Sequence, residues 1–246
     1  GDTSEPILQA ARDGGQVEIE LDSSSVPTRG RQLVFSRTAG PAGRAPDGNA
    51  RDREGGRIVI AAHIDTKYET PGALDNAAGV ATLVSVMERL REARPSVDVD
   101  IVPFNGEEYY EVSGQRAYLD YRSPFVETTR LMVNLDGLGH RDSQSAFSFY
   151  NTGADPGRAG PVGGAYTQTA RRLIQEHPRM TAGEPWIAGD HAIFAFQGIP
   201  CIAVTSSNLM ERVVQLTHTQ GDTTDEVDVG LLDETAAVIA EVVSPA

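Results

Sequence analysis

The chain has 246 residues, of which 39% are hydrophobic, and a formal net charge of −14 at pH 7. This length and apolar content suit one sizeable core, so a single domain over residues 1–246 is favoured over two. The acidic balance leaves no basic stripe for a phosphate backbone, which disfavours nucleic acid and anionic membrane surfaces as partners. Because Cys201 is the only cysteine, an internal disulfide and a Cys-rich zinc finger are excluded, and a metal site must use His and carboxylates.

No apolar run approaches the roughly 20 residues of a membrane helix, so we expect no membrane span. No charged-then-apolar signal peptide follows Gly1. Since the chain begins without Met, we expect the natural protein to be longer.

The N-terminal edge, residues 1–56, is expected to hold strands and a flexible loop. Apolar and charged residues alternate over 17–21, as in a half-buried strand, and 32–37 could continue a sheet edge. Residues 38–56 are rich in Gly, Pro, Ala, Arg and Asp, which predicts the loop.

Three buried strands are predicted to end beside a His or an acidic residue: 57–62 before His63, 97–104 before Glu107 and Glu108, and 130–135 before Asp136. The other predicted elements are helices over 76–94, 116–121, 166–177 and 231–243, strands over 147–150 and 199–204, and a Gly-rich loop over 151–164. Strands that alternate with helices indicate a layered α/β fold with a mainly parallel sheet. Since function in such sheets lies beyond the carboxyl ends of the strands, the pattern predicts a site there.

His63 and Asp65 follow the first of these strands. An imidazole at this place can ligate a metal while the Asp65 carboxylate holds its other ring nitrogen and fixes the tautomer. A turn His that is hydrogen-bonded to a turn Asp is an equally good interpretation of these two residues alone.

Asp75 directly precedes the Ala-rich helix. Asp is a common capping residue at helix N-termini. A carboxylate at this place can also bridge two cations, and the two roles are compatible.

Glu107 and Glu108 are adjacent acids at the end of an apolar strand, where they repel each other unless a cation or proton lies between them. Neighbouring side chains on an extended segment diverge. One carboxylate can therefore bind a metal while the other takes a proton from the attacking water. Two solvated loop acids are the alternative interpretation.

Asp136 ends the third strand, and His218 lies in a polar loop ahead of the last helix. With the residues above they make two His and three metal-binding acids. This donor set suits Zn²⁺, with Co²⁺ or Mn²⁺ as substitutes.

The chain resembles the aminopeptidases with co-catalytic zinc, the bacterial leucyl aminopeptidase type, over nearly the whole stretch from Arg57 to Val229. Six ordered segments carry the resemblance: AAHIDT (61–66), PGALDNAAGVATLV (71–84), FNGEEYYEVSGQRAYL (104–119), VNLDGLG (133–139), GDHAIFAFQGIPCI (189–202) and HTQGDTTDEVD (218–228). The resemblance implies a three-layer α/β fold, with a mixed, mainly parallel central sheet flanked by helices. It also implies hydrolysis of the N-terminal peptide bond of peptides with a free N-terminus, and it favours a secreted or periplasmic location.

By the same resemblance, two Zn²⁺ ions are expected per chain. One would be held by His63 and Asp136, the other by Glu108 and His218, and Asp75 would bridge them.

The resemblance also assigns two catalytic residues. Glu107 would be the proton shuttle, and Asp65 would be the partner of His63. A cis peptide bond is implied at Asp75–Asn76.

Four further residues fall near the substrate pocket of the family. Thr217 and Trp186 stand where members often carry a Tyr near the scissile carbonyl, so the oxyanion donor is left open. Asp190 and His191 belong to a segment near the pocket, where structural support is favoured over direct chemistry.

Two other functions fit the same pattern. Glutaminyl cyclases are acyltransferases that share the ligand pattern, and the HIDTK stretch (63–67) is similar to theirs, but they tend to have a Trp where Thr217 stands. A catalytically silent binding or receptor domain of the same fold is the other alternative. Such a domain has little need of the full set of ligands and base that this chain retains.

Overall fold

The computed structural model describes residues 30–38, 56–93, 95, 97–109, 112–152 and 161–244, together with residues 9 and 12. Contacts divide the chain into a unit Gly1–Gly30 and a unit Arg31–Ala246, and the elements below belong to the second. The strand predicted over 17–21 and nearly all of the loop predicted over 38–56 lie outside the described residues. The single domain over 1–246 stays a prediction.

In the described part of the chain, the centre is a seven-stranded sheet in the order β1-β3-β2-β4-β7-β5-β6. Its strands are β1 (Phe35–Arg37), β2 (Arg57–His63), β3 (Asp98–Phe104), β4 (Thr129–Leu135), β5 (Ser145–Tyr150), β6 (Met180–Ala182) and β7 (Cys201–Ser206). The central strands β3, β2, β4 and β7 run parallel, whereas β1 pairs antiparallel with β3 and β5 antiparallel with β7. The predicted mixed, mainly parallel sheet is confirmed.

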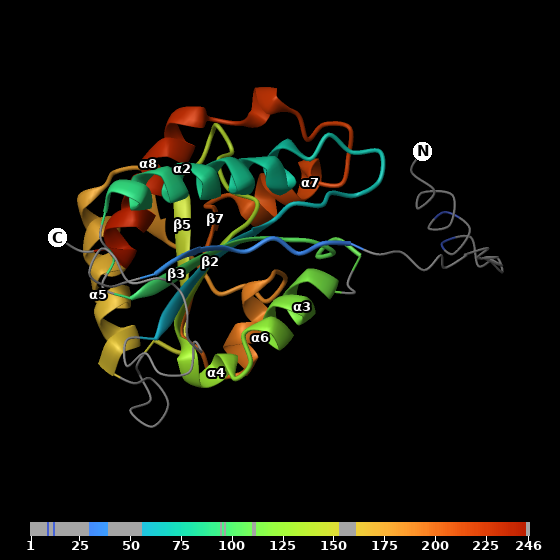
Figure 1. Cartoon of the computed structure of the whole chain (residues 1–246). Coiled ribbons are helices and arrows are strands. Elements are labelled where there is room, and N and C mark those ends of the chain that lie inside the picture. Colours follow the sequence, from blue (N-terminus) through green and yellow to red (C-terminus); the bar gives the residue numbers. More distant parts are fainter. Residues whose placement is uncertain are drawn as a thin grey trace. The chain divides into compact units, whose positions relative to one another are not determined.

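Helices cover both faces of this sheet (Figure 1). They are α2 (Ala78–Glu92), α3 (Ser113–Tyr121), α4 (Phe125–Thr128), α5 (Pro161–Glu176), α6 (His191–Phe196), α7 (Val214–Leu216) and α8 (Val229–Val243), with short helical turns η2 (Ala73–Ala77), η3 (Leu209–Val213) and η4 (Thr224–Glu226). Helices α2, α5 and α8 pack on one face and α3 and α6 on the other. The three-layer fold is thereby confirmed.

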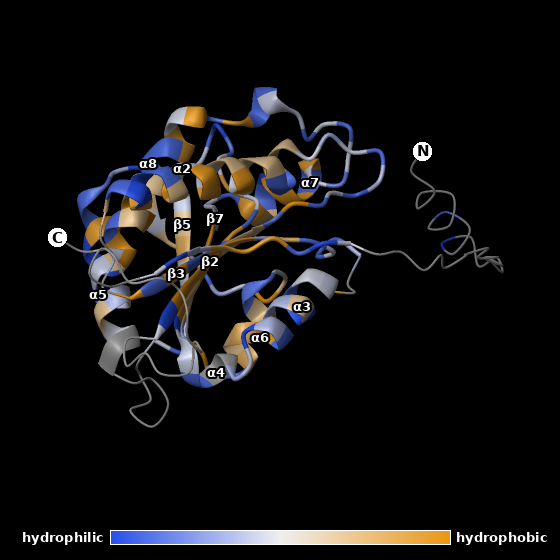
Figure 2. Ribbon diagram, viewed as in Figure 1, coloured by the Kyte–Doolittle hydropathy of each residue, from blue (hydrophilic) through white to orange (hydrophobic). Residues whose placement is uncertain are grey.

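Strand β2 shows how the sequence supplies both layers of the core. All seven of its residues are buried, as expected for a strand covered on both faces. Ile58 and Ile60 pack with α2, α5 and α8, whereas Val59 and Ala61 pack with residues of α3 and α6. Figure 2 shows hydrophobic residues along these central strands.

A buried ion-pair network fastens β3 to its surroundings. The Asp100 carboxylate is fully buried, 2.9 Å from Arg57 Nε and 2.8 Å from Arg122 Nε. It also accepts hydrogen bonds from the hydroxyls of Tyr118 at 2.9 Å and Ser36 at 2.7 Å. A buried charge is tolerated when it is paired and hydrogen-bonded in this way.

Two boundaries differ from the prediction. The strand predicted over 199–204 lies at Cys201–Ser206, because Pro200 has no N–H to donate to the sheet. Helix α5 begins at Pro161, so the end of the loop predicted over 151–164 is wrong. Proline suits the first position of a helix, where its missing N–H costs nothing.

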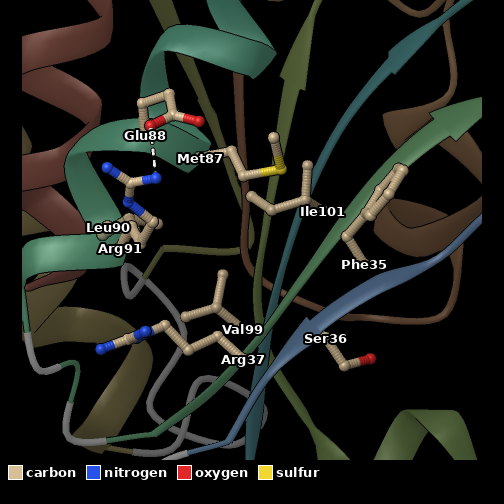
Figure 3. A pocket seen from close by; sticks show the side chains of 9 residues that line it. All are labelled: Phe35, Ser36, Arg37, Met87, Glu88, Leu90, Arg91, Val99 and Ile101. Carbon is tan, nitrogen blue, oxygen red and sulfur yellow. Dashed lines mark ion pairs between the residues drawn. The ribbon is translucent and has the colours of Figure 1, made fainter.

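The β1 edge carries a pocket of about 230 Å³ between β1, β3 and α2 (Figure 3). Phe35, Met87, Leu90, Val99 and Ile101 are among its lining residues. None of the predicted site residues lines it.

Within the described residues, no helix combines the length and apolar character that crossing a membrane requires.

Candidate metal centre

The predicted ligands come from the carboxyl ends of three adjacent strands. His63 is the last residue of β2, Glu108 follows β3, and Asp136 follows β4. Parallel pairing of β3, β2 and β4 brings these ends together, and the Ile64 N–H bonds the Phe104 carbonyl at 2.7 Å.

Two imidazoles share one carboxylate at this edge. His63 Nε2 lies 3.0 Å from Asp75 Oδ1 and 3.3 Å from Asp136 Oδ1. His218 Nε2 lies 3.0 Å from Asp75 Oδ2 and 3.0 Å from Glu108 Oε2. The structure therefore brings all five predicted ligands together, with Asp75 between two His-carboxylate pairs. Among the described residues, ligand atoms of His63, Asp75 and Glu108 lie within 4.8 Å of one another.

The protonation of His63 follows from its neighbours. Its Nδ1 lies 2.9 Å from the backbone carbonyl of Asp65, which can only accept, so Nδ1 donates there and Nε2 is the nitrogen that faces the carboxylates. Burial acts to lower the pKa of His63, but the Asp136 and Asp75 carboxylates outweigh it and raise the pKa. A metal cation can take the place of that added proton.

The sequence allowed Asp75 both to cap the helix and to bind cations, and in the structure Asn76 takes the first of these roles. The Asn76 amide oxygen accepts a hydrogen bond from the Gly79 N–H in the first turn of α2 at 3.1 Å. The Asp75 carboxylate, in contrast, faces His63 and His218. The capping bond thus falls to Asn76 and leaves the Asp75 carboxylate for a ligand. The implied cis peptide bond at Asp75–Asn76 is confirmed.

Asp222 holds this turn in place and was not among the residues predicted from the sequence. Its buried carboxylate accepts hydrogen bonds from the backbone N–H of Leu74 at 2.6 Å and of Asp75 at 3.2 Å. The available signal was an acid four residues after His218 in the same segment.

The Asp65 carboxylate was predicted to hold the second ring nitrogen of His63, but it bonds to the turn after β3 instead. Its carboxylate is 4.0 Å from His63 Nδ1, whereas it accepts three backbone hydrogen bonds, from Gly106 at 2.9 Å, Glu107 at 3.3 Å and Glu108 at 3.1 Å. The imidazole is held by the Asp65 backbone carbonyl instead. The carboxylate is better placed for the turn after β3, because that turn presents three converging N–H groups.

Glu107 has an environment that favours its neutral form. Burial raises the pKa of Glu107 to about 8, with a further contribution from Asp136, while His63 acts in the opposite direction. For Glu108, burial and then Asp75 raise the pKa, opposed by His218, His63 and Lys67. A bound cation would stabilise the charged form of both carboxylates.

The donor set and its spacing fit zinc. Ligands about 2.0–2.1 Å from a tetrahedral zinc ion are about 3.3 Å apart from one another. The four nitrogen-to-oxygen distances are 3.0–3.3 Å. Among the described residues, Glu108 Oε1 is also buried without a hydrogen-bond partner, as a ligand atom would be.

The four predicted pocket residues make contacts of their own and are not among the five predicted ligands. The buried Asp190 carboxylate accepts from the Gln115 amide, and burial raises the pKa of Asp190 to about 7. His191 Nε2 donates to the Trp186 carbonyl at 2.9 Å, the Trp186 and His191 ring centroids are 4.7 Å apart, and burial lowers the pKa of His191. Thr217 directly precedes His218 and bonds the Val213 carbonyl through its N–H. Their part in substrate binding stays a prediction.

Known proteins resemble this chain in sequence and in fold. A vacuolar membrane protease from Yarrowia lipolytica is 27% identical over 139 residues, which cover 52% of this chain and 14% of that protein. An aminopeptidase from Aneurinibacillus sp. strain AM-1 superposes with a TM-score of 0.67 at 19% identity, over 86% of this chain and 47% of that one. A zinc aminopeptidase from Bacillus subtilis superposes with a TM-score of 0.64 at 17% identity, over 86% of this chain and 49% of that one.

The chain thus corresponds to a small part of the curated relative and about half of each structural neighbour. The structural likeness shows the fold. The family model of peptidase family M28 matches residues 45–243, which is most of the chain. The resemblance seen in the sequence is therefore confirmed, and the chain belongs to peptidase family M28, a family of metallopeptidases.

Proposed function

We propose that this chain is a zinc-dependent aminopeptidase unit, which binds two Zn²⁺ ions and hydrolyses the N-terminal peptide bond of peptides with a free N-terminus. The observation that carries the proposal is the arrangement around Asp75. Its two carboxylate oxygens each lie 3.0 Å from a different imidazole, that of His63 and that of His218. A carboxylate that faces two separate nitrogen donors is suited to bridge two cations.

His63 and Asp136 would hold one ion and Glu108 and His218 the other, with Asp75 shared. When bound there, the two zinc ions supply a water of lowered pKa and polarise the scissile carbonyl. The Asp65 carboxylate keeps the turn with Glu107 and Glu108 in place through its three backbone hydrogen bonds.

Glu107 would accept the proton of the attacking water and pass it to the leaving amine. Glu107 is next in sequence to Glu108, and Asp136 and His63 both influence its pKa, which supports a position beside the same cluster. A carboxylate in this position can take up a proton and release it again.

The site also favours a substrate that carries a positive charge. The acids at this edge are Asp65, Asp75, Glu107, Glu108 and Asp136. With the buried Asp190, which interacts with Asp136 and His63, six carboxylates face two divalent cations and the Lys67 ammonium, and the one remaining negative charge attracts the α-amino group of a peptide. The two structural neighbours from Aneurinibacillus and Bacillus subtilis are aminopeptidases, which supports the same choice.

The test is a panel of aminoacyl substrates and their N-blocked counterparts, assayed with added Zn²⁺ or with a chelator, together with the zinc content per chain. We expect about two zinc ions, activity that the chelator removes and zinc restores, and no cleavage of blocked substrates. The Glu107→Gln variant should keep its zinc and lose about 10²–10⁴-fold in kcat. Glu92→Gln, on the exposed end of α2, is the matched control.

Three results would contradict the proposal. Full hydrolysis by Glu107→Gln would remove Glu107 from the reaction. Conversion of N-terminal Gln peptides to pyroglutamyl products without release of an amino acid would indicate a cyclase. Less than one zinc per chain and no turnover would indicate a silent domain.

A further inference from the structure

Lys67 is the only lysine in the chain, and it lies at the candidate metal centre. Its Nζ is 3.4 Å from Glu108 Oε2 and 5.0 Å from the centre of the Tyr109 ring. A cation beside a metal ligand opposes the binding of a second cation there. The position of Lys67 is therefore not explained by metal binding.

An anion beside Lys67 would offset this repulsion. An ammonium group has three N–H donors, so the ion pair with Glu108 is compatible with a second carboxylate. The side chains also differ in access, since that of Lys67 is 25% exposed and that of Glu108 only 3%. Lys67 can thus meet a molecule that arrives from solvent.

The site has a closed end and an open end. Asp190 and Gln115 are buried at one end, with Asp190 electrostatically coupled to Asp136 and His63. At the other end His218 is 47% exposed and Tyr109 is 53% exposed, and Lys67 lies beside them. When the N-terminal residue of a substrate occupies the closed end, the rest of the substrate therefore extends towards solvent past Lys67.

The geometry of a bound dipeptide would bring its C-terminal carboxylate within reach of Lys67. Consecutive Cα atoms are about 3.8 Å apart, so the C-terminal carboxylate of a dipeptide lies only about 5 Å from the scissile carbonyl. A longer peptide has an uncharged amide at that place.

We propose that Lys67 binds a substrate carboxylate on the residue after the scissile bond, and that this contact selects dipeptides with a free C-terminal carboxylate. The inference rests on the proposed aminopeptidase function and names its substrate class. Lys67 acts here as a specificity residue, because it contacts the leaving half of the substrate and not the scissile bond.

The kinetic test compares Leu-Gly with Leu-Gly-amide in zinc-loaded protein. We expect kcat/KM to be about five- to tenfold higher for Leu-Gly, as for one partly exposed ion pair to a charged group. In Lys67→Gln this ratio should fall to about one, mainly through a higher KM for Leu-Gly, and Lys67→Arg should retain most of it. Arg91→Gln, which removes an exposed cation from α2, should keep the wild-type ratio.

Leu-Glu-amide separates the two sources of a carboxylate. If it is cleaved as poorly as Leu-Gly-amide, the C-terminal carboxylate is the group bound, as proposed. If it is cleaved as well as Leu-Gly, a side-chain carboxylate also binds, and the dipeptide selectivity is overturned.

A second readout does not depend on turnover. Labelling with ¹³Cε,¹⁵Nζ-lysine keeps all three N–H donors and labels only Lys67. In zinc-loaded Glu107→Gln, Leu-Gly should shift the Lys67 Cε and Nζ resonances and Leu-Gly-amide should leave them unmoved. If no substrate is hydrolysed, the proposed aminopeptidase fails, and this titration still decides the role of Lys67. An equal response to Leu-Gly and its amide, or a wild-type kinetic ratio in Lys67→Gln, would overturn the inference.

Discussion

Replacing Asp65 with Asn tests whether one carboxylate holds the catalytic turn. In the structure, one oxygen accepts from the N–H groups of Gly106 and Glu107, and the other accepts from that of Glu108. Asn keeps the shape but offers only one accepting oxygen. If that oxygen replaces Oδ1, the new NH₂ group points at the Glu108 N–H, and two donors face each other.

The magnitude follows from these three bonds. An N–H left without its acceptor costs about 1–3 kcal/mol. The two remaining bonds change from charged to neutral acceptors and weaken by roughly half. We expect Asp65→Asn to lower the free energy of unfolding of the zinc-free protein by about 2–4 kcal/mol. Because Glu108 would no longer be held in place, zinc affinity should fall about 10–100-fold.

The assays are urea denaturation of the zinc-free protein and zinc competition against a chromophoric chelator. Asp142→Asn is the matched control, because the Asp142 side chain is 77% exposed. A zinc affinity within twofold of the wild type, together with an unchanged free energy of unfolding, would refute the role given to Asp65. A loss of stability without a loss of zinc affinity would show that the turn is held but does not position Glu108.

Two further predictions concern the stability of the fold. Asp100→Ala leaves Arg57 and Arg122 without their buried partner, and should lower the free energy of unfolding in urea by about 3–5 kcal/mol; a loss below about 1 kcal/mol would contradict the importance of the network. Gly79→Ala should destabilise by about 1–3 kcal/mol, because a Cβ there would lie 2.1 Å from Asn76 Oδ1 and 2.8 Å from the Leu135 carbonyl oxygen. In the same urea assay Ala81→Gly, on the exposed side of α2, serves as the control for helix propensity. If Gly79→Ala is as stable as the wild type, the turn before α2 can move to admit the extra methyl group.

The central strands and the ligands could be predicted because each carries a local signal. Residues 57–62 form an unbroken apolar run and end in a His, so both the strand and its functional end are visible in the sequence. The sequence predicts too late a start for helix α5, because Gly163 and Gly164 are typical of a loop. The packing of the later residues Leu173 and Ile174 in the core supports the whole helix.

The sequence by itself determined the fold class, the strand ends at which chemistry is placed and the candidate ligands at those ends, because apolar periodicity and the residues that follow each strand are local properties. Asp75 and His218 follow no strand, and the resemblance of their segments to the aminopeptidases identified them as ligands. Tertiary structure alone decided which atoms meet. It placed the Asp65 carboxylate on the turn with Glu107 and Glu108, put Asp222 behind Asp75, and set Lys67 against Glu108. These contacts join residues that are between about 40 and 150 positions apart in the sequence. Their partners are chosen by the packing of strands and loops, which no short segment encodes.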